Sequence, residues 1–79
     1  MSERKELESA YRDMLARAMR AEGSWRYGQA AFNVAYQNWP NHVAMLRGTL
    51  VDPFYDDRRV EAFITVLFSV NPATGENWS

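Results

Sequence analysis

The chain has 79 residues, of which 47% are hydrophobic and 14% aromatic, and its formal net charge is -1. This length is typical of one domain, so we expect residues 1–79 to form a single unit. Because the sequence has no cysteine, a disulfide framework, a thiolate metal site and a cysteine nucleophile are excluded. The near-zero net charge also argues against generic binding to nucleic-acid phosphates, which requires clustered basic residues.

A chain of this size builds only a marginal core. Surface scaling gives a folded area of about 4,900 Å² against about 13,300 Å² for the unfolded chain, so roughly 63% of the surface is buried. Without disulfides, stability must come from large side chains, well-packed helices or oligomerisation. The three Trp, four Tyr and four Phe supply the large side chains, and some of them could instead contact a partner.

An amphipathic helix is predicted over about 3–22. Ser2 suits its N-cap and Gly23 its C-terminal stop. Apolar residues recur at helical spacing along one stripe: Leu7, Ala10, Tyr11, Met14, Leu15, Ala18 and Ala21. Two acid-first i,i+4 pairs are expected on the outer face, namely Glu8–Arg12 and Asp13–Arg17.

The second predicted helix spans about 25–38 and ends before Pro40. It is apolar on two nearly opposite faces, so it should lie between other elements or between the domain and a partner. Gly28 in its interior costs about 1 kcal/mol relative to Ala, and we expect a close helix crossing to compensate. One face holds Trp25, Gly28, Phe32, Ala35, Tyr36 and Trp39, and the other holds Tyr27, Ala31 and Val34.

Residues 27–46 contain no Asp, Glu, Lys or Arg. Polar side chains and Pro40 interrupt this run, whereas a membrane-spanning helix needs about 20 predominantly apolar residues. We therefore predict that residues 27–46 form the buried centre of the domain and do not span a membrane.

Within the run, Gln29 and Asn33 need hydrogen-bond partners if buried. We expect them to tie the segment Gly48–Asp52 to the helix, and the alternative is a polar spot in an apolar recognition patch.

A short helix over about 42–47 is predicted next, with Asn41 as N-cap and Gly48 as its stop. The connector Gly48–Tyr55 is unusually apolar for a loop, so we expect it to pack on the core.

The last predicted helix spans about 57–70, with Asp56 or Asp57 favouring its N-terminus and Asn71-Pro72 ending it. Residues 71–79 are expected to form a flexible tail or to fold back through the Trp78 ring. The fold class is therefore all-α: a compact bundle of three main helices plus one short helix. The spacing that defines the last helix is carried by Val60, Phe63, Ile64, Leu67 and Val70.

Motifs for chemistry are weak. His42 is the single histidine, and no G-x-S-x-G or H-E-x-x-H signature accompanies it. An acidic cluster at Asp52–Glu61 could offer oxygens to calcium or magnesium, but the EF-hand spacing is missing and helix capping explains part of it. We therefore expect no enzyme activity, no metal and no cofactor.

A helix-turn-helix is disfavoured, because the second of its helices would bring only Arg47 to DNA.

Part of the chain resembles a group of small uncharacterised proteins from phages and bacteria. The resembling pieces are Arg26-Tyr27-Gly28-Gln29, Phe32-Asn33, Arg47-Gly48-Thr49, Asp52-Pro53-Phe54-Tyr55-Asp56-Asp57 and Phe63. They lie between residues 26 and 68, a little over half of the chain. The resemblance implies a compact helical domain and a phage origin, and it transfers no catalytic residues.

The expected function is that of a small protein-binding protein, such as a phage-encoded, anti-CRISPR-like inhibitor of a host protein or defence complex. Trp, Tyr and Arg are favoured interface anchors, and an acidic C-terminal third would suit a basic partner surface. The alternative is a self-associating accessory protein, a homodimer, and a nucleic-acid-binding helix-turn-helix ranks lower. The candidate interface residues are Trp25, Tyr27, Tyr36, Trp39, Asp56, Asp57, Arg58 and Trp78.

The N-terminal segment MSERKELESA is charged and lacks the apolar stretch of a signal peptide. We therefore expect a cytoplasmic protein, located in the host cytoplasm if a phage encodes it. The expected partner is a host or cognate protein.

Overall fold

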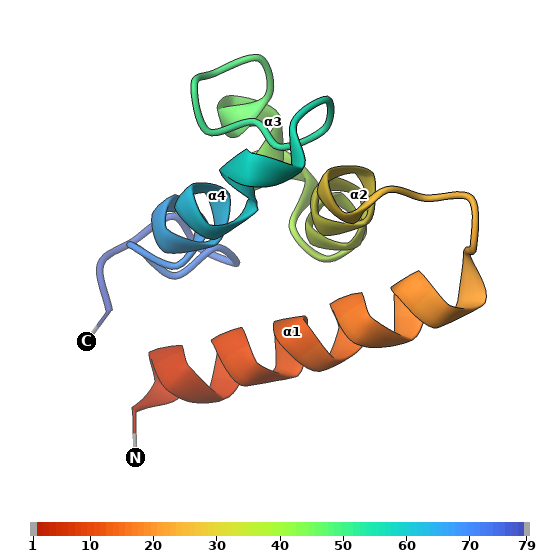
Figure 1. Cartoon of the computed structure of the whole chain (residues 1–79). Helices are drawn as coiled ribbons and strands as arrows, with labels where there is room; N and C mark the ends of the chain where they lie inside the picture. Colours follow the sequence, from red (N-terminus) through yellow and green to blue (C-terminus); the bar gives the residue numbers. More distant parts are fainter. Residues whose placement is uncertain (1, 79) are drawn as a thin grey trace.

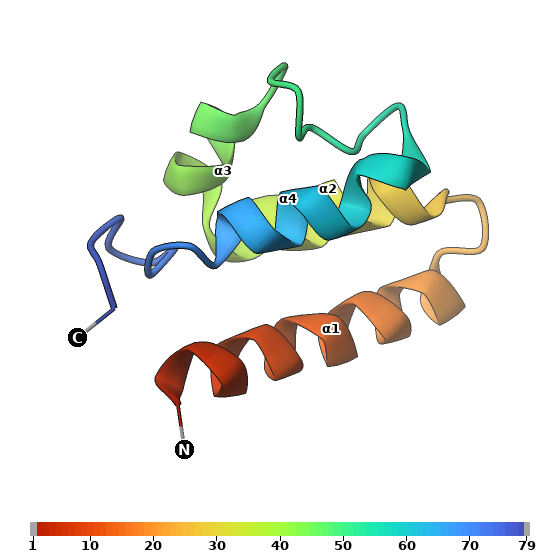
Figure 2. The same cartoon turned by 60° about the vertical axis from the view of Figure 1, so that its left-hand side comes forward.

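Two helices lie side by side on top of a third in the computed structural model, which describes residues 2–78 (Figures 1 and 2). The long helix α1 crosses beneath α2 and α4, while α3 and the connector that follows it lie on the opposite side. Over the described residues the chain is all-α, which confirms the predicted fold class. The elements are α1 (Glu3–Ala21), α2 (Tyr27–Asn38), α3 (Pro40–Leu46), the short 3-10 turn η1 (Asp57–Arg59) and α4 (Val60–Leu67).

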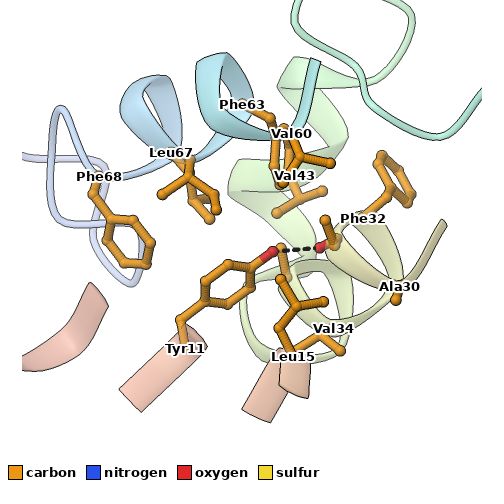
Figure 3. Close-up of a cluster of buried hydrophobic side chains, with 13 residues drawn as sticks. Tyr11, Leu15, Ala30, Phe32, Val34, Val43, Val60, Phe63, Leu67 and Phe68 are labelled. Carbon is orange, nitrogen blue, oxygen red and sulfur yellow. Dashed lines mark hydrogen bonds between the residues drawn. The ribbon is translucent and has the colours of Figure 1, made fainter. Parts of the chain in front are cut away.

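The core forms where α1, α2 and α4 meet (Figure 3). Tyr11 of α1 is fully buried, and its hydroxyl donates a hydrogen bond of 2.6 Å to the carbonyl oxygen of Ala31 on α2. Its ring also contacts that of Phe68 edge-on, with centroids 5.6 Å apart. One side chain thus joins α1 to α2 and to the residue that follows α4. The rest of the core is Leu15, Ala30, Ala31, Phe32, Val34, Ala35, Val43, Val60, Phe63, Ile64, Leu67 and Phe68.

Helix α1 ends at Ala21, one residue before its predicted end. Of its predicted apolar stripe, Tyr11 and Leu15 are buried, whereas Ala10 and Ala21 are exposed because they lie at the margins of the contact. Leu7, Met14 and Ala18 are partly buried against the core.

The ion pairs of α1 differ from the prediction. Arg12 pairs with Glu8 at 3.3 Å as expected. It also reaches Glu61 of α4 at 3.0 Å, a contact between distant segments that helical spacing does not indicate. Asp13 and Arg17 form no ion pair among the described residues. The outer face of α1 is thus tied to α4 through one arginine.

The predicted apolar faces of α2 are covered except at Tyr36, which is 42% exposed, and the reason for Gly28 is different from the expected helix crossing. A Cβ atom built on Gly28 would lie 1.9 Å from the carbonyl oxygen of Pro53, so the connector itself presses against the helix here. The Gly28 N–H also donates to Asp57 Oδ1 at 2.9 Å. The connector therefore packs on α2 through Pro53, which is buried.

The amide side chains of α2 do not tie the connector to the helix, which corrects that expectation. Gln29 Oε1 instead accepts a hydrogen bond of 3.2 Å from the backbone N–H of Arg26, just before the helix. This local cap places the first residue of α2 at Tyr27, two residues later than predicted. Asn33 is half-buried and has no hydrogen bond to the connector.

Helix α3 begins at Pro40, two residues earlier than predicted, and Trp39 rather than Asn41 precedes it as N-cap. Proline is well suited to the first helical position, because its missing N–H would have no partner there. Pro40 therefore starts the new helix as well as ending the previous one.

The last helix is shorter than the predicted span 57–70. It opens with η1, where Asp56 Oδ1 accepts from the N–H of Arg58 at 3.0 Å, so Asp56 is the cap. It closes at Leu67, because the Ser69 hydroxyl donates to the Val66 carbonyl at 2.7 Å and competes with further helical turns.

The segment after α4 folds back on the domain over the residues that the structure describes. Trp78 Nε1 donates a hydrogen bond of 2.8 Å to the carbonyl oxygen of Phe68, one of the carbonyls left without a helical partner. This is the folded-back alternative of the sequence prediction, and Ser79 lies outside the described residues. Among the helices of residues 2–78, none is both long and apolar enough to cross a membrane.

Candidate functional site

Four of the candidate interface aromatics take part in packing. Trp25, Tyr27, Trp39 and Trp78 are all partly buried against the core. The Trp39 ring meets Phe68 edge-on at a centroid separation of 5.7 Å. Much of the aromatic content of the chain therefore stabilises the domain, as the size argument anticipated, and little of the surface of these four rings is left for a partner.

The charged candidates are engaged in local structure. Asp56 caps η1 and pairs with Arg58 at 3.1 Å and with Arg59 at 3.6 Å. The hydrogen bonds from Arg58 lower the pKa of Asp56 below its usual value. Asp57 accepts from Gly28. The Arg58 side chain is 90% exposed, so it is the charged candidate most accessible to a partner.

Glu61, at the end of the acidic cluster, is also paired. Glu61 accepts two hydrogen bonds from Arg12, at 3.0 and 3.3 Å, and these lower its pKa. No group of three or more His, Asp or Glu side chains within residues 2–78 could hold a metal ion.

Large apolar side chains are exposed along α3, the connector and the end of α2. Tyr55 is 90% exposed, Leu50 87%, Met45 76% and Tyr36 42%. We call these four residues the exposed apolar face. Met45 lies on α3 and Leu50 and Tyr55 on the connector, segments that lie opposite α1 (Figure 1), whereas Tyr36 lies in the last turn of α2.

Tyr36 and Tyr55 of this face are linked by contacts between aromatic rings. Tyr36 stacks on Phe32 with centroids 6.0 Å apart, and Phe32 meets Phe54 edge-on at 5.6 Å. Phe54 in turn contacts the Tyr55 ring at 4.8 Å. A continuous row of four rings thus runs from α2 into the connector, with buried Phe32 as its base.

A shallow hollow of about 120 Å³ opens beside this row. Three rings and two charged side chains line it: Phe32, Phe54, Tyr55, Arg47 and Asp52. The two charges differ in their surroundings. Asp52 accepts the N–H of Gly48 at 2.6 Å and that of Phe54 at 3.0 Å, whereas Arg47 has no carboxylate partner among the described residues.

The loop that forms one wall of the hollow has a defined conformation. Gly48 has φ +77°, a left-handed conformation that glycine adopts without a steric penalty. The Thr49 hydroxyl donates to the Leu46 carbonyl at 2.6 Å, and Asp52 holds both ends of the turn. Together with the contact between Pro53 and Gly28, these bonds fix the rings of the hollow relative to α2.

His42 lies at the other end of α3. Its Nε2 atom is buried without a hydrogen-bond partner, beside the turn formed by Pro72–Gly75. The side chain as a whole is half-buried, so the packing of the C-terminal segment covers it.

Sequence reasoning found only Tyr36 of the exposed apolar face. It expected the whole connector to pack on the core, but only Pro53 and Phe54 do so. Leu50 and Tyr55 project outward, and the connector has no helical or strand period that would indicate which side chains turn inward. The available signal was the excess of apolar residues in a loop.

The fold and the site define a small all-α domain that exposes apolar side chains on α2, α3 and the connector, beside an arginine that has no ion pair within residues 2–78. Comparison with known proteins adds nothing further, since the chain matches no protein-family model, no curated protein and no solved structure.

Proposed function

We propose that this chain acts by binding another protein through its exposed apolar face, without catalysis. The observation that carries the proposal is the exposure of four large apolar side chains on α2, α3 and the connector, of which Tyr36 and Tyr55 are joined by the row of rings through Phe32 and Phe54. Tyrosine is enriched among the residues that dominate binding energies at interfaces. Complete burial of each large apolar side chain contributes about 1.5–3 kcal/mol, so three or four of them supply a substantial driving force.

In its finer form, the proposal is an inhibitor that docks on a host protein or defence complex in a bacterial cytoplasm. The support for this setting is the resemblance to small phage and bacterial proteins, whose distinctive residues include Arg47-Gly48-Thr49 and Asp52–Asp57. All five residues that line the hollow belong to the resembling pieces, whereas of the exposed apolar face only Tyr55 does.

A second candidate function is self-association. The same face could bury itself against a second copy, because a two-fold interface uses one surface twice. Light scattering across a dilution series separates the candidates: a dimer that persists at low concentration favours self-association, and a monomer at all concentrations excludes it.

The test of protein binding is capture from bacterial lysate with the tagged chain and the double variant Leu50→Ser with Tyr55→Ser. Both side chains are almost fully exposed, so the variant should fold like the wild type. We expect the wild type to retain a partner at a fixed stoichiometry and the double variant to lose it.

The control is Ala16→Ser, a change to an exposed residue on the opposite side of the domain. It should retain the partner as the wild type does. Equal retention by the wild type and the double variant would contradict the assignment of the face, and absence of a stoichiometric partner would contradict protein binding.

A further inference from the structure

We infer that the hollow beside Tyr55 recognises an acidic peptide segment of the partner, in which an apolar side chain enters the hollow and an adjacent carboxylate pairs with Arg47. This inference rests on the proposed function and names the chemistry of the partner. Three observations carry it: the size of the hollow, its aromatic walls and the charge at its rim.

The volume of the hollow fits one aliphatic side chain. The hollow measures about 120 Å³. An apolar cavity of about 150 Å³ holds one benzene molecule, so this smaller space suits the four heavy atoms of a leucine or isoleucine side chain. Since Phe32 and Phe54 form the walls, the space favours an apolar occupant.

The charged side chains that line the hollow indicate which residue of the peptide lies next to the apolar one. Among the side chains that line the hollow, Asp52 has both carboxylate oxygens bound to backbone N–H groups of its own turn. Arg47 carries the opposite charge and is exposed, with no ion pair within residues 2–78. A guanidinium fork binds carboxylates in a bidentate manner, so an acidic residue next to the apolar one provides the complementary group.

A nucleic acid is the less favoured occupant. Aromatic rings and arginine also bind single strands by stacking and phosphate contact. Such sites need a basic groove along the backbone, whereas the one charged residue of the connector is Asp52, two further aspartates follow it at Asp56 and Asp57, and the chain has a net charge of -1. The observations therefore favour a peptide.

The experiment uses the whole chain labelled with nitrogen-15 and titrated with capped four-residue peptides. The first peptide holds a leucine followed by a glutamate, the second replaces the glutamate with lysine, and the third replaces the leucine with alanine. We expect shifts of the amide signals of Arg47, Phe54 and Tyr55 with the first peptide, and affinities roughly tenfold weaker for the other two.

The arginine is tested by Arg47→Gln, with Arg47→Lys as the conservative variant and Arg17→Gln as the matched control. Arg17 is exposed on α1 and undergoes the same loss of charge. We expect Arg47→Gln to bind the glutamate and lysine peptides equally, Arg47→Lys to recover part of the preference, and Arg17→Gln to bind as the wild type does. An unchanged spectrum outside the connector verifies that each variant is folded.

Several outcomes would overturn the inference. These are equal binding of the glutamate and lysine peptides to the wild type, an unchanged preference in Arg47→Gln, no shift at the hollow with any peptide, or tighter binding of a 12-nucleotide oligothymidylate than of the glutamate peptide. If partner capture from lysate still depends on Leu50 and Tyr55 in such a case, protein binding stands and only the acidic specificity fails.

Discussion

At the scale of single residues, the contact between Gly28 and Pro53 decides how the connector lies. No side chain larger than hydrogen fits at Gly28, because the Pro53 carbonyl oxygen occupies the place of a Cβ atom. The same residue donates its N–H to Asp57, so α2 holds both the connector and the start of η1 at one point.

We expect Gly28→Ala to destabilise the domain by about 1–3 kcal/mol, since the overlap exceeds the gain of about 1 kcal/mol in helix propensity. Urea unfolding followed by circular dichroism measures the change. Gly23→Ala is the matched control, because nothing lies within 4 Å of its added Cβ, and it should leave stability unchanged or slightly raised. A stabilised Gly28→Ala variant would contradict the close contact.

Tyr11 makes stability sensitive to alkaline pH. Burial raises the pKa of its hydroxyl above the ordinary value near 10, with a smaller contribution from Tyr27. Because the folded pKa is raised, the stabilisation by the neutral hydroxyl is fully present below the unfolded pKa and is lost as the pH rises above about 10 towards the folded value.

We therefore expect wild-type stability to fall above pH 10 and Tyr11→Phe to fall less steeply. At pH 7 the variant should lose about 1 kcal/mol, because the hydrogen bond to Ala31 is removed. Unfolding curves from pH 7 to 11 measure both effects, and Tyr55→Phe, which removes an exposed hydroxyl, is the control. Identical pH profiles for Tyr11→Phe and the wild type would refute this role.

At the scale of helices, α4 is short but supplies much of the core. Four of its eight residues are buried, namely Val60, Phe63, Ile64 and Leu67. A helix of this length is not stable alone in water, so packing rather than helix propensity maintains it.

We expect Leu67→Ala to lower the free energy of unfolding by about 2–5 kcal/mol, which is a large part of the stability of so small a domain. Thermal unfolding provides the measurement. Thr65→Ala is the control on the same helix, since Thr65 is exposed and bonds only to the Glu61 carbonyl. An unshifted melting curve for Leu67→Ala would contradict the assignment of α4 to the core.

Sequence periodicity predicts the helices well and their ends poorly, for physical reasons visible in α3 and α4. The apolar repeat that includes Phe63 and Leu67 reports the buried face, which packing enforces. Helix ends depend on local bonds such as that from the Ser69 hydroxyl to Val66, and on Pro40 serving as a first residue.

The candidate site was harder to predict because it lies on a connector. Nothing in the pattern around Leu50 distinguishes an inward from an outward side chain, since that choice is set by tertiary contacts such as Pro53 against Gly28. The tryptophans were attractive interface candidates by residue type, yet the domain uses Trp39 and Trp78 for its own packing.

At the scale of the whole molecule, the chain is as compact as expected for its length. Its radius of gyration is 11.9 Å, against about 11.6 Å for a compact chain of this length. Its accessible surface is 5211 Å², close to the value of about 4,900 Å² from size scaling. The exposed apolar side chains of α2, α3 and the connector are therefore a feature of an otherwise ordinary surface.

The fixed connector has a consequence for the kinetics of association. Because Asp52, Gly48 and the contact of Pro53 with Gly28 already hold the rings in place, the proposed partner would meet a pre-organised site, and little conformational entropy would be lost on binding. We therefore expect association to proceed as a rigid-body encounter without a slow rearrangement of the loop, so that differences in affinity between partners lie in the lifetime of the complex.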